Sequence, residues 1–174
     1  MNKSGFTLIE LLVVAIIMSV LTSIALPQYR RAMDRSKAAE AMQMLPALFE
    51  ARERWVIENQ CKWSGGAITS CDNSATFTPK KLDIETNGTV NNTSGTITTD
   101  NFVYTLVDKG SSSLAQACLS AKPRWGENRG LKNGATIWYR GDKFSCNGNQ
   151  KGCDILNVIR KKNKEATLEY QGCI

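Results

Sequence analysis

Apolar residues dominate the start of the chain. From Phe6 to Leu26 there is one charged residue, Glu10, among 21. A membrane-spanning helix needs about 20 predominantly apolar residues. A carboxylate inside such a segment is costly in lipid, so it needs a partner or a function. The pattern therefore predicts a membrane-spanning helix in which Glu10 has a functional role.

The helical pattern continues beyond the apolar segment in a different form. From Arg30 to Asn59 the chain is rich in strong helix formers, and spacings of three and four define one mostly apolar stripe. The stripe comprises Ala38, Met42, Leu45, Phe49, Arg52 and Val56, with the arginine as an interruption. A single helix from Phe6 to about Asn59 would be roughly 80 Å long, too long for one small domain to cover. Pro27 and Pro46 are expected to bend it or to open it locally.

Beyond the helix, the pattern changes to that of a loop followed by strands. The segment 61–95 is rich in Ser, Thr, Asn and Gly and is typical of a connecting loop, with a short extended piece at 82–84. Runs of β-forming residues separated by turns then predict an antiparallel sheet packed on the helical stripe. The candidate strands are 102–107, 114–121, 136–139, 144–146 and 166–170. The segment 155–159 fits either a strand or a helix, and the predicted fold class is α+β.

Cysteines add a covalent constraint to this picture. The chain has six, all beyond the apolar segment: Cys61, Cys71, Cys118, Cys146, Cys153 and Cys173. An even number outside a membrane segment indicates disulfides in an oxidising compartment, with 15 connectivities open. Loop length favours Cys61–Cys71 and Cys146–Cys153 as local pairs, which leaves Cys118 for Cys173. The rival reading is a zinc site, which the lack of histidine and of any Cys-x-x-Cys spacing disfavours.

The formal charge of +6 is unevenly distributed. Between Lys122 and Lys164 there are eleven basic and three acidic residues, a local balance of +8, so the remainder carries about −2. Such a region can attract a polyanion, and an aromatic residue among basic ones can stack on the bases of single-stranded DNA. The candidate polyanion-binding residues are Arg124, Trp125, Arg129, Arg160, Lys161 and Lys162. An ordinary solvated surface, or a face toward a neighbouring subunit, is the simpler interpretation.

Catalytic chemistry finds little support in the sequence. The absence of histidine excludes Ser-His and Cys-His dyads. No phosphate-binding glycine loop or calcium loop is present, and no acidic pair has the spacing of a hydrolytic site. We therefore expect a protein that is not an enzyme, with no cofactor and no bound metal.

The residues at the start of the apolar segment carry a specific resemblance. The run Gly5-Phe6-Thr7-Leu8-Ile9-Glu10-Leu11-Leu12-Val13-Val14 resembles the processing site of type IV prepilins and of type II secretion pseudopilins. The resemblance is dense from Gly5 to about Met42 and includes the run Ala25-Leu26-Pro27-Gln28-Tyr29. It implies the type IV pilin fold, a long N-terminal α-helix packed on a C-terminal antiparallel β-sheet and stabilised by disulfides.

The same resemblance implies roles for individual residues. Gly5 would precede the bond cut by prepilin peptidase, and Phe6 would become the N-methylated N-terminus. Glu10 would attract the N-terminal amine of a neighbouring subunit, which agrees with the helix geometry because residues four apart share a face. Pro27 would lie where the helix of a pilin can melt on packing into a filament. Ordinary signal cleavage near Ala25 is the alternative, disfavoured by the length of the segment and by Glu10.

The chain thus divides into five expected segments: leader 1–5, membrane and polymerisation half-helix 6–26, amphipathic half-helix 27–60, connecting loop 61–95, and sheet with C-terminal disulfide region 96–174. The expected function is that of a pilus subunit for adhesion, twitching motility or DNA uptake. Alternatives are a secretion pseudopilin and a minor pilin that binds DNA or a surface. Expected partners are copies of itself, other pilins, prepilin peptidase, the inner-membrane assembly platform, the membrane itself, and DNA or a host surface.

The expected location is the inner membrane first and a surface pilus or periplasmic pseudopilus afterwards. Charge counting disagrees with this topology. Basic residues favour the cytoplasmic side of a membrane helix, yet only Lys3 precedes the helix, whereas Arg30, Arg31, Arg35 and Lys37 follow it. We give the cysteines and the resemblance more weight, because disulfides need an oxidising compartment.

Overall fold

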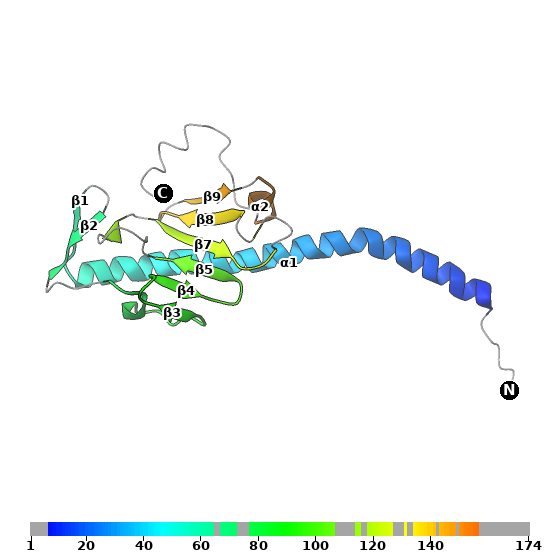
Figure 1. The fold of residues 1–174 in the computed structure, drawn as a ribbon, viewed down its shortest axis with the longest axis horizontal. Helices are drawn as coiled ribbons and strands as arrows, with labels where there is room; N and C mark the ends of the chain where they lie inside the picture. Colours follow the sequence, from blue (N-terminus) through cyan, green and yellow to red (C-terminus); the bar gives the residue numbers. More distant parts are fainter. Residues whose placement is uncertain are drawn as a thin grey trace.

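A computed structural model describes residues 7–64, 67–72, 77–106, 114–115, 118–126, 131, 134–141, 143–148 and 150–156. One long helix, α1 (Leu8–Glu58), runs through the molecule. Its C-terminal half lies against a β-sheet, and its N-terminal half projects away from the rest of the chain (Figure 1). The predicted α+β architecture of a long N-terminal helix and an antiparallel sheet is confirmed.

The two prolines in α1 do not interrupt it. The helix is continuous through Pro27 and Pro46, and in Figure 1 its projecting half is curved but unbroken. The expected local opening is therefore not seen in the monomer. A proline removes one hydrogen-bond donor and crowds one carbonyl, and a long helix can absorb this as curvature.

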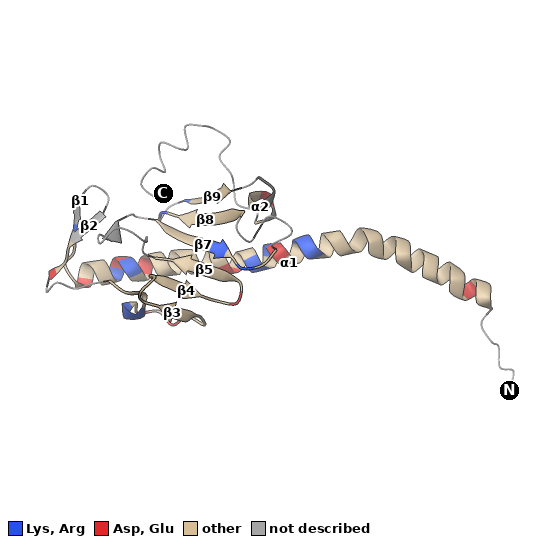
Figure 2. Cartoon of the chain, viewed as in Figure 1, with Lys and Arg blue, Asp and Glu red and all other residues tan. Residues whose placement is uncertain are grey.

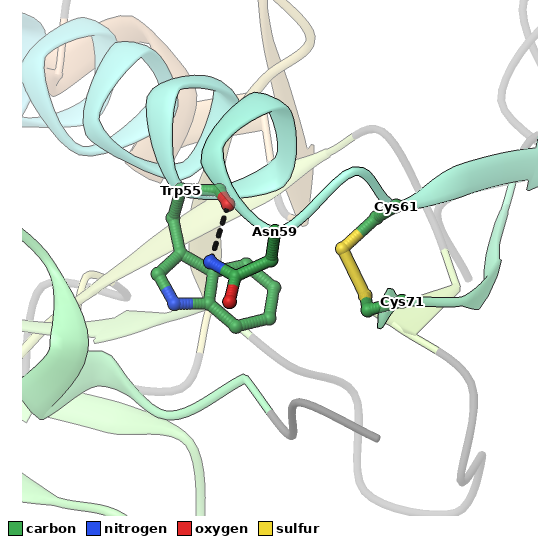
Figure 3. The surroundings of a disulfide bond; sticks show 4 residues. All are labelled: Trp55, Asn59, Cys61 and Cys71. Atoms are coloured by element: carbon green, nitrogen blue, oxygen red, sulfur yellow. Dashed lines mark hydrogen bonds between the residues drawn. A yellow bond between two sulfur atoms is a disulfide. The ribbon is translucent and has the colours of Figure 1, made fainter. Parts of the chain in front are cut away.

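Helix α1 ends at a well-defined cap, shown in Figure 3. The Nδ2 of Asn59 donates to the carbonyl of Trp55 at 2.8 Å. Backbone bonds from Gln60 to Ile57 and from Cys61 to Val56, with Gln60 in the left-handed conformation (φ 48°), form a Schellman motif. The helix end is thus fixed by its own backbone next to the Cys61–Cys71 disulfide.

The main sheet has six antiparallel strands in the order β3-β4-β5-β7-β8-β9. The strands are β3 (Thr89–Asn91), β4 (Thr96–Thr98), β5 (Phe102–Thr105), β7 (Leu119–Pro123), β8 (Ala135–Tyr139) and β9 (Phe144–Gly148). A three-stranded sheet combines β1 (Lys62–Ser64), β2 (Ala67–Ser70) and β6 (Leu114–Ala115). The remaining elements are the 3-10 turn η2 (Pro79–Lys81) and the short helix α2 (Gln150–Ile155).

Several predicted boundaries differ from the structure. The expected loop 61–95 contains β1, β2 and β3, and its predicted extended piece at 82–84 is not a strand. The single candidate strand 114–121 is divided between β6 and β7, which belong to different sheets. The helix α2 ends where the ambiguous segment 155–159 begins. The candidate strand 166–170 lies outside the described residues.

The core lies between the C-terminal half of α1 and one face of the main sheet. In β5, Phe102 and Tyr104 are fully buried, and they alternate with half-buried Val103 and Thr105, as the two-residue period of a strand requires. On α1 the buried line runs through Ala38, Ala41, Leu45, Leu48, Ala51, Arg52, Trp55 and Val56. Met42 and Phe49 of the predicted stripe lie at its edge, half-buried.

Disulfides close two local loops. They join Cys61 to Cys71 and Cys146 to Cys153, the two pairs that loop length favours. Cys118 is also disulfide-bonded. Its expected partner, Cys173, lies outside the described residues, so that pairing stays a prediction.

Candidate functional site

The N-terminal half of α1 has no protein cover. Every residue from 7 to 33 is exposed, and the apolar side chains face all directions around the helix rather than forming one stripe. Among the described residues, α1 is the one helix long and apolar enough to cross a membrane. Such a surface is stable only in lipid or against other apolar helices.

Glu10 lies at the start of this uncovered surface and closes a capping box with Thr7. Its Oε2 accepts hydrogen bonds from the backbone nitrogen and the hydroxyl of Thr7, both at 2.8 Å, while the Glu10 backbone nitrogen donates to the Thr7 hydroxyl at 3.3 Å. The second carboxylate oxygen, Oε1, accepts no hydrogen bond from the described residues. Glu10 therefore keeps an acceptor available for a further donor. Gly5 and Phe6 lie outside the described residues.

The hydroxyl groups of the apolar segment are satisfied within the helix. Ser19, Thr22 and Ser23 donate to the carbonyls of Ile16, Met18 and Val20 at 2.7–2.8 Å. In a medium without water, such internal bonds remove the cost of an unpaired polar group. Glu10 is thus the polar group in this segment that still has an open position.

The globular part is anchored to α1 where the helix first meets the sheet. Asp34 is 3% exposed, and its Oδ1 accepts a hydrogen bond from Nε1 of Trp125 at 2.9 Å. The Trp125 ring packs edge-on against Phe102, with ring centroids 4.9 Å apart, and the Nζ of Lys37 lies 5.3 Å from its centroid. Gly126 follows with φ +75°, a conformation that suits glycine and turns the chain here. This cluster fixes the position along α1, at Asp34, where the contact between the helix and the sheet begins.

A second anchor is the carboxylate of Glu40, two turns further along α1. It accepts hydrogen bonds from the hydroxyl of Thr99 at 2.6 Å, from Nδ2 of Asn101 at 2.7 Å and from the hydroxyl of Tyr104 at 3.2 Å. Burial, with a smaller contribution from the Glu40 charge, raises the pKa of Tyr104 well above its usual range. Glu40 thereby ties the helix to the β4–β5 connection and to β5.

Sequence reasoning missed both anchors. Asp34 and Glu40 lie on a helix rich in charged residues, where acids are ordinarily solvated. One signal was present for Asp34, because it lies four residues before Ala38 and therefore on the same helix face. No comparable signal marks Glu40, since its partners are about 60 residues away.

Arg52, the residue that interrupts the predicted apolar stripe, is buried in the structure. It is 2% exposed, forms an ion pair with Glu53 at 3.2 Å, and its guanidinium lies 4.7 Å from the ring centroid of Phe49. Burial lowers the pKa of Arg52. A guanidinium on an aromatic face is a packing arrangement, and it contributes to the helix–sheet interface.

The predicted polyanion-binding residues are not brought together in the described part of the chain. Arg124 is exposed, and its NH1 donates to the carbonyl of Thr99 at 2.5 Å. Trp125 has its indole N–H bonded to Asp34 and its ring packed on Phe102, so the contacts present are those of an anchor rather than of a base-stacking platform. The other candidates, Arg129, Arg160, Lys161 and Lys162, lie outside the described residues. Within the described ranges, no three acidic, cysteine or histidine side chains are grouped as metal ligands.

Comparisons with known proteins agree with the N-terminal pattern. Residues 1–26 match the family described as "Prokaryotic N-terminal methylation motif". Over 57 residues the chain is 43% identical to "Type IV major pilin protein PilA" of Myxococcus xanthus (strain DK1622), covering 33% of this chain and 26% of that protein. Over 58 residues it is 38% identical to a "Fimbrial protein" of Pseudomonas aeruginosa, covering 33% of this chain and 38% of that protein. The match thus spans well under half of either relative, and no solved structure matches the chain significantly.

Proposed function

Since this chain belongs to the type IV pilin family, we propose that it is a structural subunit of a type IV pilus. In this proposal, prepilin peptidase cuts between Gly5 and Phe6, Phe6 is N-methylated, and an inner-membrane assembly platform adds the subunit to a filament of its copies and other pilins. The pilus serves adhesion, twitching motility or DNA uptake. The chain itself performs no covalent chemistry.

The observation that carries the proposal is the uncovered half of α1. Residues 7–33 are all exposed, and from Leu11 to Leu26 they carry no charge on any side of the helix, whereas the line of residues buried against the sheet begins at Asp34. An element of this kind has two suitable environments, the bilayer and a bundle of identical helices. Moving from one to the other keeps its apolar surface out of water, so assembly proceeds without a large loss of burial.

Glu10 would favour the movement of the helix from the bilayer into the filament. A carboxylate in lipid is costly, and a neighbouring N-terminal amine would offset much of that cost by pairing with it in a medium of low dielectric constant. The available Oε1 of Glu10 suits this role. The pairing would favour the register in which the amine of one Phe6 meets the Glu10 of its neighbour.

Gene deletion followed by electron microscopy tests the proposal most directly. We expect loss of surface filaments, restored by the intact chain and not by Gly5→Leu, whose product should stay unprocessed in the membrane. Asn2→Ala is the matched control, because it changes the leader away from the scissile bond. Normal Phe6 N-termini in the Gly5→Leu protein, seen by mass spectrometry, would contradict the processing step.

Two alternatives predict different phenotypes. A type II secretion pseudopilin would cause loss of secretion without loss of surface pili. A minor pilin that binds DNA through its basic residues would leave filaments present but lower DNA retention, which should fall steeply with salt. The names of the matched relatives, a major pilin and a fimbrial protein, are the reason for placing the filament subunit first.

A further inference from the structure

A cluster of positive charge follows the apolar segment of α1. Between residues 27 and 39 there are four basic residues, Arg30, Arg31, Arg35 and Lys37, and one acid, Asp34, a balance of +3. Figure 2 shows this charge on the helix where it approaches the sheet. Basic residues are disfavoured on the non-cytoplasmic side of a membrane helix, so their presence there calls for a role.

The spacing along α1 places these residues at the membrane surface. Leu8 to Leu26 spans about 27 Å at 1.5 Å per residue, close to the roughly 30 Å thickness of a hydrocarbon core. Arg30 and Arg31 follow about 6 Å beyond Leu26, at the depth of the lipid headgroups. Tyr29, which precedes them, is 63% exposed, and tyrosine is typical of this interfacial layer.

The three arginines are exposed, and the nearby acids are engaged by other residues. Arg30, Arg31 and Arg35 are exposed and form no ion pair within the described residues. Asp34 is buried against Trp125, and Glu40 is occupied by Thr99, Asn101 and Tyr104. The positive charge is therefore presented to the solvent or to the membrane surface.

The helix geometry places Arg30 and Arg31 close to the face of α1 that is buried further along the chain. At 100° per residue, Arg30 and Arg31 lie on either side of the line that Asp34 and Ala38 continue into the buried interface. They thus lie on the side of α1 toward which the sheet is attached, one turn before the Asp34–Trp125 anchor. Exposed Lys122 and Arg124 at the end of β7 add charge to the globular part.

We propose that Arg30, Arg31 and Arg35 form a collar around α1. While the subunit is still in the inner membrane, this collar binds the phosphate groups of anionic phospholipids in the leaflet that faces away from the cytoplasm. Guanidinium groups suit this partner because they bind phosphate through two parallel hydrogen bonds and remain charged at any physiological pH. The inference rests on the proposed membrane stage of the pilin. It adds that the subunit is surrounded by selected lipids, which it must release on entering a filament.

Lipid analysis of the full-length chain tests the collar. The protein is reconstituted in vesicles of equal parts phosphatidylcholine and phosphatidylglycerol, excised with its surrounding lipid by a styrene–maleic acid copolymer, and the lipids are counted by mass spectrometry against protein-free discs. We expect the ratio of phosphatidylglycerol to phosphatidylcholine to be about two to five times higher in discs that hold the intact chain than in protein-free discs. The triple variant R30Q/R31Q/R35Q should lose this enrichment, whereas R30K/R31K/R35K should keep most of it.

A matched control separates the collar from general charge. Lys80 and Lys81 are adjacent exposed cations on η2, far along the chain from the membrane segment, and K80Q/K81Q should leave the enrichment unchanged. Equal phosphatidylglycerol in discs with and without the protein, or enrichment that survives R30Q/R31Q/R35Q, would overturn the collar. A chain that alkaline carbonate extracts from pure phosphatidylcholine vesicles would instead refute the membrane stage, and the collar would fall with it.

Discussion

The indole nitrogen of Trp125 donates a hydrogen bond to the buried carboxylate of Asp34, 91 residues earlier in the chain, at 2.9 Å. We expect Trp125→Phe to lower the free energy of unfolding by about 1–3 kcal/mol, because it keeps an aromatic ring against Phe102 but removes a donor from a buried acid. Thermal unfolding of the full chain in detergent measures the effect. Tyr29→Phe, at an exposed position, should change nothing, and equal stabilities of the two variants would show that the bond contributes little.

The Tyr104 hydroxyl, bonded to Glu40, predicts a loss of stability at alkaline pH. Burial holds the pKa of Tyr104 above its usual range of about 10. Above about pH 10 the unfolded chain loses this proton and the folded chain keeps it, so the unfolded state binds fewer protons and stability falls as pH rises. The contribution is fully present below about pH 10. Urea unfolding as a function of pH should show a shallower alkaline loss for Tyr104→Phe than for the intact chain, and parallel curves would contradict the assignment.

Glu10 closes the cap of α1 with Thr7, and its proposed pairing with a neighbouring amine is a separate role that substitutions can test. Glu10→Val should permit processing but abolish filament assembly, because the carboxylate for a neighbouring amine is gone. Thr7→Ala is the control: it removes the cap of α1, worth about 1 kcal/mol, but keeps the carboxylate. Mass spectrometry reports processing and electron microscopy reports filaments. Abundant filaments formed by the Glu10→Val protein as sole subunit would count against pairing, and loss of filaments in Thr7→Ala would point to the cap instead.

The two local disulfides should differ in their effect on stability. Removing either loop closure is expected to cost about 2–3 kcal/mol, since the sequence separations are similar, 10 for Cys61–Cys71 and 7 for Cys146–Cys153. Cys153 is fully buried, whereas both Cys61 and Cys71 are half-buried. The double variant C146A/C153A should therefore lower the melting temperature more than C61A/C71A. The opposite order would show that the cap of α1 depends on its disulfide.

The sequence predicted the elements that depend on neighbouring residues and missed the contacts between residues far apart in the chain. Local patterns predicted α1 almost to its end and the β8–β9 hairpin, because hydrophobic period and turn residues act over a few positions. The β1–β2 hairpin was missed because its Ser- and Thr-rich strands lack the alternation of a half-buried strand. Trp125 was named as a candidate for base stacking, and its bond to Asp34 was missed because the two residues are remote in sequence and no local pattern encodes such a pair. The processing and assembly roles of Gly5, Phe6 and Glu10 came from motif resemblance and remain predictions.

The division of α1 into an uncovered and a packed half has a mechanical consequence. A pull along the helix axis would shear the interface with the sheet, and in shear the contacts from Asp34 to Val56 resist together rather than one after another. The projecting half has no such lateral support within its own subunit and contains Pro27. Under tension a subunit should therefore lengthen first in that half, which would act as the compliant spring while the sheet remains a rigid body.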